Sequence, residues 1–122
     1  HYFSIRKMHF LKRAKALVAF PGGYGTMDEV FETLTLIQTR KVEPFPVVLF
    51  GKEFWEEVIN WDSFVKRGLI SREDLDIIRF CETAEEAWRY IRQFWQYSAD
   101  NGDGDDHWPQ YPPEESQSGK EA

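Results

Sequence analysis

The sequence predicts a Rossmann-like α/β fold, in which a doubly wound parallel sheet is flanked by helices. Two short, continuous apolar runs, residues 16–20 and 46–50, each end at a turn that contains glycine, as buried parallel strands commonly do. An apolar pattern with helical period follows each run. The 122 residues are 42% hydrophobic and 30% charged, which is typical of one globular domain.

The expected elements alternate between strand and helix. In chain order they are a helix-like stretch at residues 4–14, a strand at 16–20, a helix from Met27 to Ile37, a strand at 46–50, a helix from Phe54 towards Gly68, a short helix after Ser71, a strand at 77–81 and a helix after Thr83. The last two helix starts read Ser71-x-x-Asp74 and Thr83-x-x-Glu86. This spacing is that of a capping box, in which two side chains bond N–H groups at the helix start.

A sheet of only three strands is small, and its open edge would leave apolar surface uncovered. The chain begins at His1 and enters a helix-like stretch almost at once. We therefore expect residues 1–97 to form the C-terminal part of a Rossmann-like domain. Either N-terminal strands belong to a longer parent protein, or a second copy of the chain covers the open edge.

The net charge of −6 is concentrated near the C-terminus. Residues 98–122 carry seven acidic side chains and one lysine, whereas residues 1–97 are neutral overall. This segment is rich in Asp, Gly, Pro, Ser and Glu and has no apolar period, which predicts a disordered acidic tail. Its Trp108 and Tyr111 are interpreted as isolated aromatic residues in solvent, with a short docking motif as the alternative. An acidic tail on a neutral body disfavours binding to nucleic acid.

Composition excludes several further classes of protein. No run of about 18 apolar residues is present to span a membrane, and the first residues lack the apolar core of a signal peptide, so we expect a cytoplasmic protein. The single Cys81 has no partner for an internal disulfide. His1, His9 and His107 are too far apart in sequence for a local metal motif, so no metal is expected. We interpret His9 as a partly buried side chain and Cys81 as a buried thiol.

The segment Pro21–Glu29, with the sequence PGGYGTMDE, joins the first strand to an amphipathic helix. Three glycines within four positions permit positive φ and close approach, so that successive N–H groups face an anion at the positive end of the helix dipole. The segment is neither a P-loop, because no Lys follows the last Gly, nor GxGxxG. A structural alternative is a tight turn in which Thr26-x-x-Glu29 forms a capping box and Asp28 and Glu32 complement the dipole.

The string PGGYGTMDE, with Arg6-Lys7 in the helix-like stretch before its strand, resembles the Lonely Guy (LOG) family. Members of this family are cytokinin riboside 5′-monophosphate phosphoribohydrolases, once described as lysine decarboxylases. The family pattern is an Arg-Lys pair followed, through a strand, by PGGxGTxxE, and Arg6 and Glu29 stand 23 positions apart, as the pattern requires. The resemblance continues through residues 36–39 and 45–49 and fades near Phe94.

The resemblance implies a Rossmann-like enzyme without a cofactor that hydrolyses the N-glycosidic bond of AMP or an N6-modified adenine nucleotide. The products are free base and ribose 5-phosphate. The residues implied to bind the phosphate are Gly22, Gly23, Gly25 and Thr26. Glu29 would stabilise the oxocarbenium-like state and orient or deprotonate water, and Arg6 would complete the catalytic site. Lys7 is a candidate substrate-binding residue, with a solvated helix position as the alternative.

The same resemblance implies a homodimer or higher homo-oligomer with sites near the subunit interface. Family members also have an earlier strand with a glycine-rich turn that helps to bind the nucleotide, and this sequence lacks that segment. A non-catalytic nucleotide-binding module is therefore the alternative function. A pyridoxal phosphate-dependent decarboxylase is disfavoured, because no lysine stands in a recognisable cofactor context.

Overall fold

The computed structural model describes residues 15–101 and 109–113. In this part of the chain the elements are β1 (Leu17–Ala19), α2 (Tyr24–Gln38), β2 (Val47–Phe50), α3 (Lys52–Val58), α4 (Trp61–Lys66), the 3₁₀ helix η1 (Arg72–Ile77), β3 (Ile78–Cys81) and α5 (Ala84–Asn101). The helix expected at residues 4–14 lies outside the described ranges. None of the described helices is long and apolar enough to cross a membrane.

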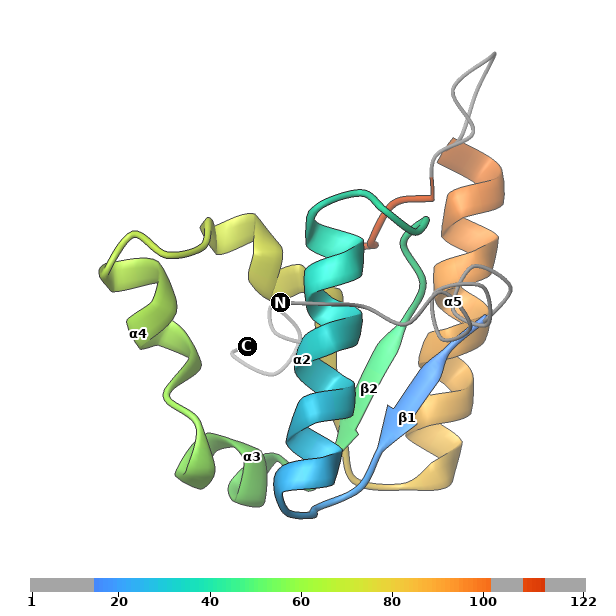
Figure 1. The fold of residues 1–122 in the computed structure, drawn as a ribbon. Helices are drawn as coiled ribbons and strands as arrows, with labels where there is room; N and C mark the ends of the chain where they lie inside the picture. The colour runs from blue at the N-terminus through green and yellow to red at the C-terminus, as the bar shows by residue number, and fades with distance from the viewer. Residues whose placement is uncertain (1–14, 102–108, 114–122) are drawn as a thin grey trace, which may run out of the picture.

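The three strands form one parallel sheet in which β2 lies between β1 and β3. The register pairs Val48 of β2 with Val18 on one side and with Arg79 on the other. Both crossovers advance across the sheet in the same direction, which places α2, α3, α4 and η1 on one face. Helix α5 follows β3 and covers the opposite face, so the strands lie between α2 and α5 (Figure 1). The predicted α/β fold with a helix-flanked parallel sheet is confirmed.

The central strand β2 is buried on both faces. Val47 and Leu49 pack into the larger core on the side of α2, whereas Val48 packs into a smaller core with residues of α5. All three side chains have 0% exposure, which explains why this strand is a continuous apolar run rather than an alternating one. Trp55 anchors α3 to the larger core, because it is fully buried and donates its Nε1–H to the Phe50 carbonyl at 2.9 Å.

Strand β1 is shorter and more exposed than its sequence predicts. We expected residues 16–20 to be fully buried, but Val18 is 39% exposed and Phe20 is 61% exposed. The two residues are two positions apart, so they share one face of the strand, whereas Ala19 between them is buried. β1 is an outer strand of the described sheet, and α5 covers this face only in part.

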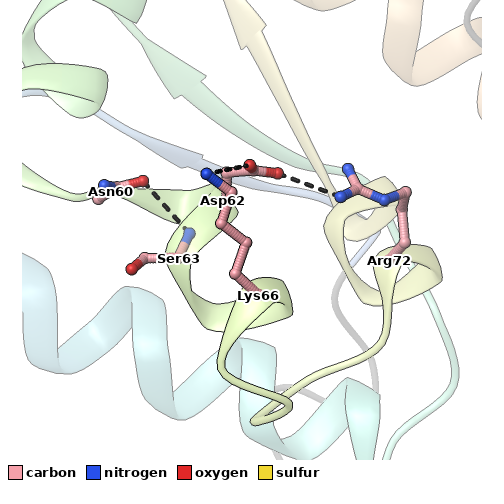
Figure 2. Close-up of polar contacts among 5 residues, drawn as sticks. All are labelled: Asn60, Asp62, Ser63, Lys66 and Arg72. Carbon is pink, nitrogen blue, oxygen red and sulfur yellow. Dashed lines mark hydrogen bonds and ion pairs between the residues drawn. The ribbon is translucent and has the colours of Figure 1, made fainter.

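Polar contacts fix the segment between β2 and β3 (Figure 2). Asn60 caps α4, because its Oδ1 accepts the N–H of Ser63 at 3.2 Å. One carboxylate oxygen of Asp62 lies 3.3 Å from Arg72 Nη2, and the other lies 3.8 Å from Lys66 Nζ. The Asp62–Arg72 pair therefore joins the start of α4 to the start of η1.

Two helix starts were predicted from Ser or Thr followed by an acidic residue, and both are confirmed. The N–H of Ser71 donates to the Asp74 carboxylate at 3.0 Å in a capping box that opens η1. Thr83 Oγ1 accepts the N–H of Glu86 at 3.1 Å at the start of α5. The Glu86 carboxylate accepts the N–H of Glu82 at 2.6 Å, one residue earlier than the predicted box requires.

Two described segments of the C-terminal region, residues 98–101 and 109–113, differ from the disordered tail that composition predicts. Helix α5 continues past Ser98, where we expected the tail to begin. Residues 109–113 lie against the body: the Tyr111 hydroxyl donates to the Phe45 carbonyl at 2.7 Å, and the Tyr111 ring centroid lies 5.1 Å from that of Phe94. The prediction of an isolated Tyr111 is wrong, because its ring packs against the larger core. Trp108 lies outside the described residues.

We predict that Tyr111→Phe lowers the free energy of unfolding by about 1–2 kcal/mol, because the Phe45 carbonyl loses its donor at a buried position. Burial first, and then the Tyr90 hydroxyl, raise the pKa of Tyr111 well above its ordinary value, so the phenol stays a donor. Urea unfolding followed by tryptophan fluorescence measures the change. Tyr97→Phe is the matched control, and equal effects of the two substitutions would contradict the assignment.

Candidate functional site

The glycine-rich segment after β1 forms an open hollow at the carboxyl end of that strand. We call it the turn hollow, and its volume is about 380 Å³. Its lining consists of β1 with Phe20 and Pro21, and of Gly25, Thr26, Glu29 and Val30 from α2. Ligand sites in open parallel sheets lie outside the carboxyl ends of the strands, so this is the position where a site is expected.

Helix α2 begins without a side-chain cap. Gly23 occupies the N-cap position and has no side chain to accept an N–H. The first intrahelical bond runs from the Met27 N–H to the Gly23 carbonyl at 3.0 Å. The N–H groups of Tyr24, Gly25 and Thr26 precede this bond and have no carbonyl partner within the helix. The first turn also contains no acidic residue, so its positive end suits an anion.

The three glycines of the turn have different surroundings. A Cβ on Gly22 would overlap Thr26 Oγ1 and lie 2.9 Å from the Thr26 Cβ, so only glycine permits this close approach. A Cβ on Gly23 or Gly25 would meet no atom within 4 Å, which leaves the space beside them open to a ligand. The turn does not use the positive φ that these glycines permit, because the positive-φ glycines of the described residues are Gly51 and Gly68.

Glu29 lies one helical turn beyond Gly25, and both residues line the turn hollow. Four residues of α-helix rise about 6 Å, so Glu29 lies about 6 Å along the helix axis from Gly25, one of the residues whose N–H has no partner within the helix. The alternative of a capping box at Thr26 and Glu29 is not formed, because α2 begins two residues before Thr26, which is therefore not its N-cap. Asp28 and Glu32 also lie beyond the first turn, and Glu32 is 8% exposed. Helix capping therefore does not account for Glu29.

Two exposed aromatic side chains flank the turn, and sequence analysis missed both. Tyr24 is 96% exposed, and Phe20 is 61% exposed. The Phe20 ring stacks on Phe50, with centroids 4.8 Å apart and planes 13° apart. Such faces bind planar rings by stacking. The position of Phe20 at the end of an apolar run could have indicated its exposure, because the last side chain of a strand often leaves the core where the strand passes into a turn.

The structure brings together five of the seven predicted site residues. Gly22 and Gly23 form the turn, and Gly25, Thr26 and Glu29 line the hollow beside it. The other two, Arg6 and Lys7, lie outside the described residues, so their roles stay predictions.

Cys81 ends β3 and is 3% exposed, which confirms the predicted buried thiol. Burial, and less strongly the nearby Glu86 carboxylate, raise the pKa of Cys81 to about 11 from 9.0. The native thiol therefore keeps its proton over a pH range in which the unfolded chain loses it.

We predict that this difference destabilises the protein at alkaline pH. Between pH 9.0 and about 11 the unfolded state binds fewer protons than the native state, so the free energy of unfolding falls as pH rises, by roughly 1–2 kcal/mol. Urea unfolding at pH values below and within this window measures the loss. Cys81→Ala should have a lower free energy of unfolding at every pH. Its free energy of unfolding should, however, fall less between the lower pH and the pH within the window. The same pH dependence in both proteins would disprove the explanation.

Comparisons with known proteins match most of the chain, and the matched range includes the glycine-rich segment Pro21–Glu29. The profile of a family described as possible lysine decarboxylase matches residues 1–91. Cytokinin riboside 5′-monophosphate phosphoribohydrolase LOG3 of Arabidopsis thaliana is 31% identical over 91 residues, which are 73% of this chain and 42% of that protein. The LOG enzyme of Oryza sativa subsp. japonica is 34% identical over 83 residues, 66% of this chain and 34% of the relative.

A bifunctional cytokinin biosynthesis protein of Fusarium pseudograminearum (strain CS3096) is 30% identical over 101 residues. The match covers 73% of this chain and 21% of the fungal protein. The chain thus spans less than half the length of each of these relatives, 42% in the case of the Arabidopsis LOG3 protein. The turn hollow lies within the matched residues.

Proposed function

The chain belongs to the Lonely Guy (LOG) family, and from this premise we propose that it acts as a nucleoside 5′-monophosphate phosphoribohydrolase. Its substrate is AMP or an N6-modified adenine nucleotide, and its products are free base and ribose 5-phosphate. The observation that carries the proposal is that Glu29 lines the same hollow as the uncapped first turn of α2.

The phosphate binds at the start of α2 in this proposal. Amide N–H groups of Tyr24, Gly25 and Thr26 donate to its oxygens, and the Thr26 hydroxyl adds a further donor. Gly23 and Gly25 leave room for the anion, because a Cβ built on either residue would have no atom within 4 Å. Binding the phosphate fixes the position of the ribose relative to the second turn of the helix.

Glu29 acts on the ribose in the next step. Water adds to C1′ while the bond between C1′ and the base nitrogen breaks, and the bonding pair leaves with the base, which takes up a proton. Positive charge develops on the sugar, and the carboxylate stabilises it and accepts the proton of the attacking water. The rise of about 6 Å from Gly25 to Glu29 matches the step from a 5′-phosphate across a ribose ring.

Arg6 and Lys7 complete this proposal from the N-terminal side. The permanent charge of Arg6 would keep Glu29 ionised and bind the phosphate or the leaving base, and Lys7 would contact substrate. The family resemblance also implies a homo-oligomer with sites near the subunit interface. A cytoplasmic location stays a prediction from the sequence.

A lysine decarboxylase fits the described residues less well. Schiff-base lysines are desolvated in a pocket that lowers their pKa. The lysines at positions 15, 41, 52 and 66 of the described chain are all exposed. The uncapped helix start, by contrast, is a ready binding site for the phosphate of a nucleotide.

The test is release of free base from AMP and from isopentenyladenosine 5′-monophosphate, followed by chromatography. Two samples are compared: the 122-residue chain, and a fusion in which it replaces the matching part of Arabidopsis LOG3. Base release by either sample supports the enzyme. Saturable nucleotide binding without base release in both would leave a binding module and overturn the proposed activity.

A further inference from the structure

The turn hollow follows the outer edge of β1. Residues 17–20 line it on the strand side, and Thr26 and Glu29 are among the α2 residues that line it on the helix side. β1 is an outer strand of the described sheet, and successive side chains of a strand point to opposite faces. Ala19 packs into the larger core on the side of α2, so Phe20 belongs to the other face. A ligand in the hollow can therefore reach both faces around this edge.

Phe20 has one ring face covered and the other open. The ring of Phe50 lies almost parallel to that of Phe20, with centroids 4.8 Å apart and planes 13° apart. Phe20 is still 61% exposed, which leaves the ring face opposite Phe50 open to solvent. Phe20 lines the turn hollow, whereas Phe50 packs against the smaller core. The hollow thus ends at an aromatic ring that is supported from behind.

The support behind Phe20 is fixed by backbone contacts. Phe50 is the last residue of β2, and its carbonyl accepts the Nε1–H of the fully buried Trp55 at 2.9 Å. The next residue, Gly51, donates its N–H to the Cys81 carbonyl at 3.0 Å. A ring that is already held by a packed neighbour loses little freedom when a ligand binds to it, which favours binding. The stacked pair is therefore preorganised for a planar ligand.

The hollow is large enough to hold the parts of a nucleotide that the proposed function places in it. Its volume of about 380 Å³ lies in the usual range of small-molecule sites, roughly 300–1,000 Å³. The base of a nucleotide is attached at C1′, on the opposite side of the ribose from the 5′-phosphate. With the phosphate at the start of α2 and C1′ at Glu29, the base extends from the helix towards the strand edge and Phe20.

We propose that the open face of Phe20 binds the base by stacking and makes the site selective for purine over pyrimidine nucleotides. The inference rests on the proposed function, because the phosphate at the start of α2 sets the position of the base. The two fused rings of a purine cover more of a phenyl face than a single pyrimidine ring, so they gain more from stacking. Stacking uses the face of the base and leaves its edge free, so a substituent at N6 is accommodated.

The test uses carbocyclic AMP and carbocyclic UMP, in which a methylene group replaces the ribose ring oxygen, so that the base stays attached. Ribose 5-phosphate is the ligand without a base. Calorimetry gives the three affinities for the 122-residue chain, or for the fusion with Arabidopsis LOG3 if the chain alone binds none of them. We expect carbocyclic AMP to bind roughly tenfold more tightly than ribose 5-phosphate and roughly fivefold more tightly than carbocyclic UMP.

NMR of the aromatic protons reports on the stack directly. The signals of the Phe20 ring are identified as those that are lost in Phe20→Leu. A base stacked on this ring should move them upfield as carbocyclic AMP is added, whereas ribose 5-phosphate should leave them in place. Unmoved Phe20 signals at saturation with carbocyclic AMP would overturn the proposal, because the base would then lie elsewhere.

Phe20→Leu keeps an apolar side chain and removes the ring. We expect it to bind carbocyclic AMP roughly tenfold more weakly and ribose 5-phosphate within about twofold of the original affinity. Trp88→Leu is the matched control, because Trp88 is similarly exposed, at 60%, but lies on α5 and does not line the hollow. An equal loss of affinity in both variants, or an unchanged preference for the purine in Phe20→Leu, would contradict the role of Phe20.

Two further outcomes separate this inference from the proposed function. Saturable binding of ribose 5-phosphate, with carbocyclic AMP no tighter, would leave the phosphate site in place and overturn the stacking. No binding of any of the three ligands to either sample would overturn the phosphate site of the proposed function, and the stacking inference with it.

Discussion

Glu29→Gln is expected to lower the rate of base release by about a thousandfold while leaving nucleotide binding within a few-fold of its original value. General-base catalysis and charge stabilisation each contribute factors on the order of 10² to 10⁴, and the amide supplies neither. The phosphate contacts come from the first turn of α2, so they survive the substitution. The measurement is single-turnover base release, in the fusion if the chain alone is inactive, together with nucleotide affinity by calorimetry.

Asp28→Asn is the matched control for this result. Asp28 is the adjacent residue of α2, is exposed, and does not line the turn hollow. The control removes the same charge from the same helix, so a general electrostatic effect would appear in both variants. A comparable loss of rate in Asp28→Asn and Glu29→Gln would argue against a specific role for Glu29. Undiminished base release by Glu29→Gln would show that Glu29 takes no part in the reaction.

Gly25→Ala and Gly22→Ala are expected to fail in different ways. A Cβ on Gly25 meets no atom within 4 Å of the protein, so Gly25→Ala should leave the fold intact. The added methyl group would occupy the space proposed for the phosphate, and we expect a ten- to hundredfold loss of AMP affinity, of the order that one lost charged contact produces. Gly22→Ala instead drives a methyl group into Thr26 and should cost about 1–3 kcal/mol of stability.

Thermal unfolding and AMP titration of both variants separate the two effects. The expected pattern is a stable Gly25→Ala protein that binds AMP poorly, and a Gly22→Ala protein with a lowered melting temperature. Normal AMP affinity in Gly25→Ala would place the phosphate elsewhere, because a methyl group beside the amides excludes an anion bound to them.

The sheet could be predicted because its signals are local. Residues 46–50 form a continuous apolar run since β2 is buried on both faces, and the turns on either side set its limits. The start of η1 followed from the spacing of Ser71 and Asp74. The glycine segment was predictable as a strand-to-helix junction, and five of its residues form the candidate site.

The errors arose where distant parts of the chain decide the outcome. Tyr111 is held by contacts with Phe94 and with the Phe45 carbonyl, and Phe45 lies 66 residues earlier in the sequence. The amino-acid composition around Tyr111 does not indicate either contact. Thr26 matched a capping box, but Gly23 begins the helix because the chain turns as soon as it leaves β1. The exposure of Val18 and Phe20 depends on how far the neighbouring elements extend over β1.

The order of the strands has a consequence for how the chain folds. β1, β2 and β3 are neighbours in space in the same order in which they occur in the sequence. As the chain leaves the ribosome, β2 and β3 therefore each find a partner strand already synthesised, and each pairing closes only the crossover between the two strands. Helix α5 is made after all three described strands, so it packs on its face of the sheet only once these strands have been synthesised.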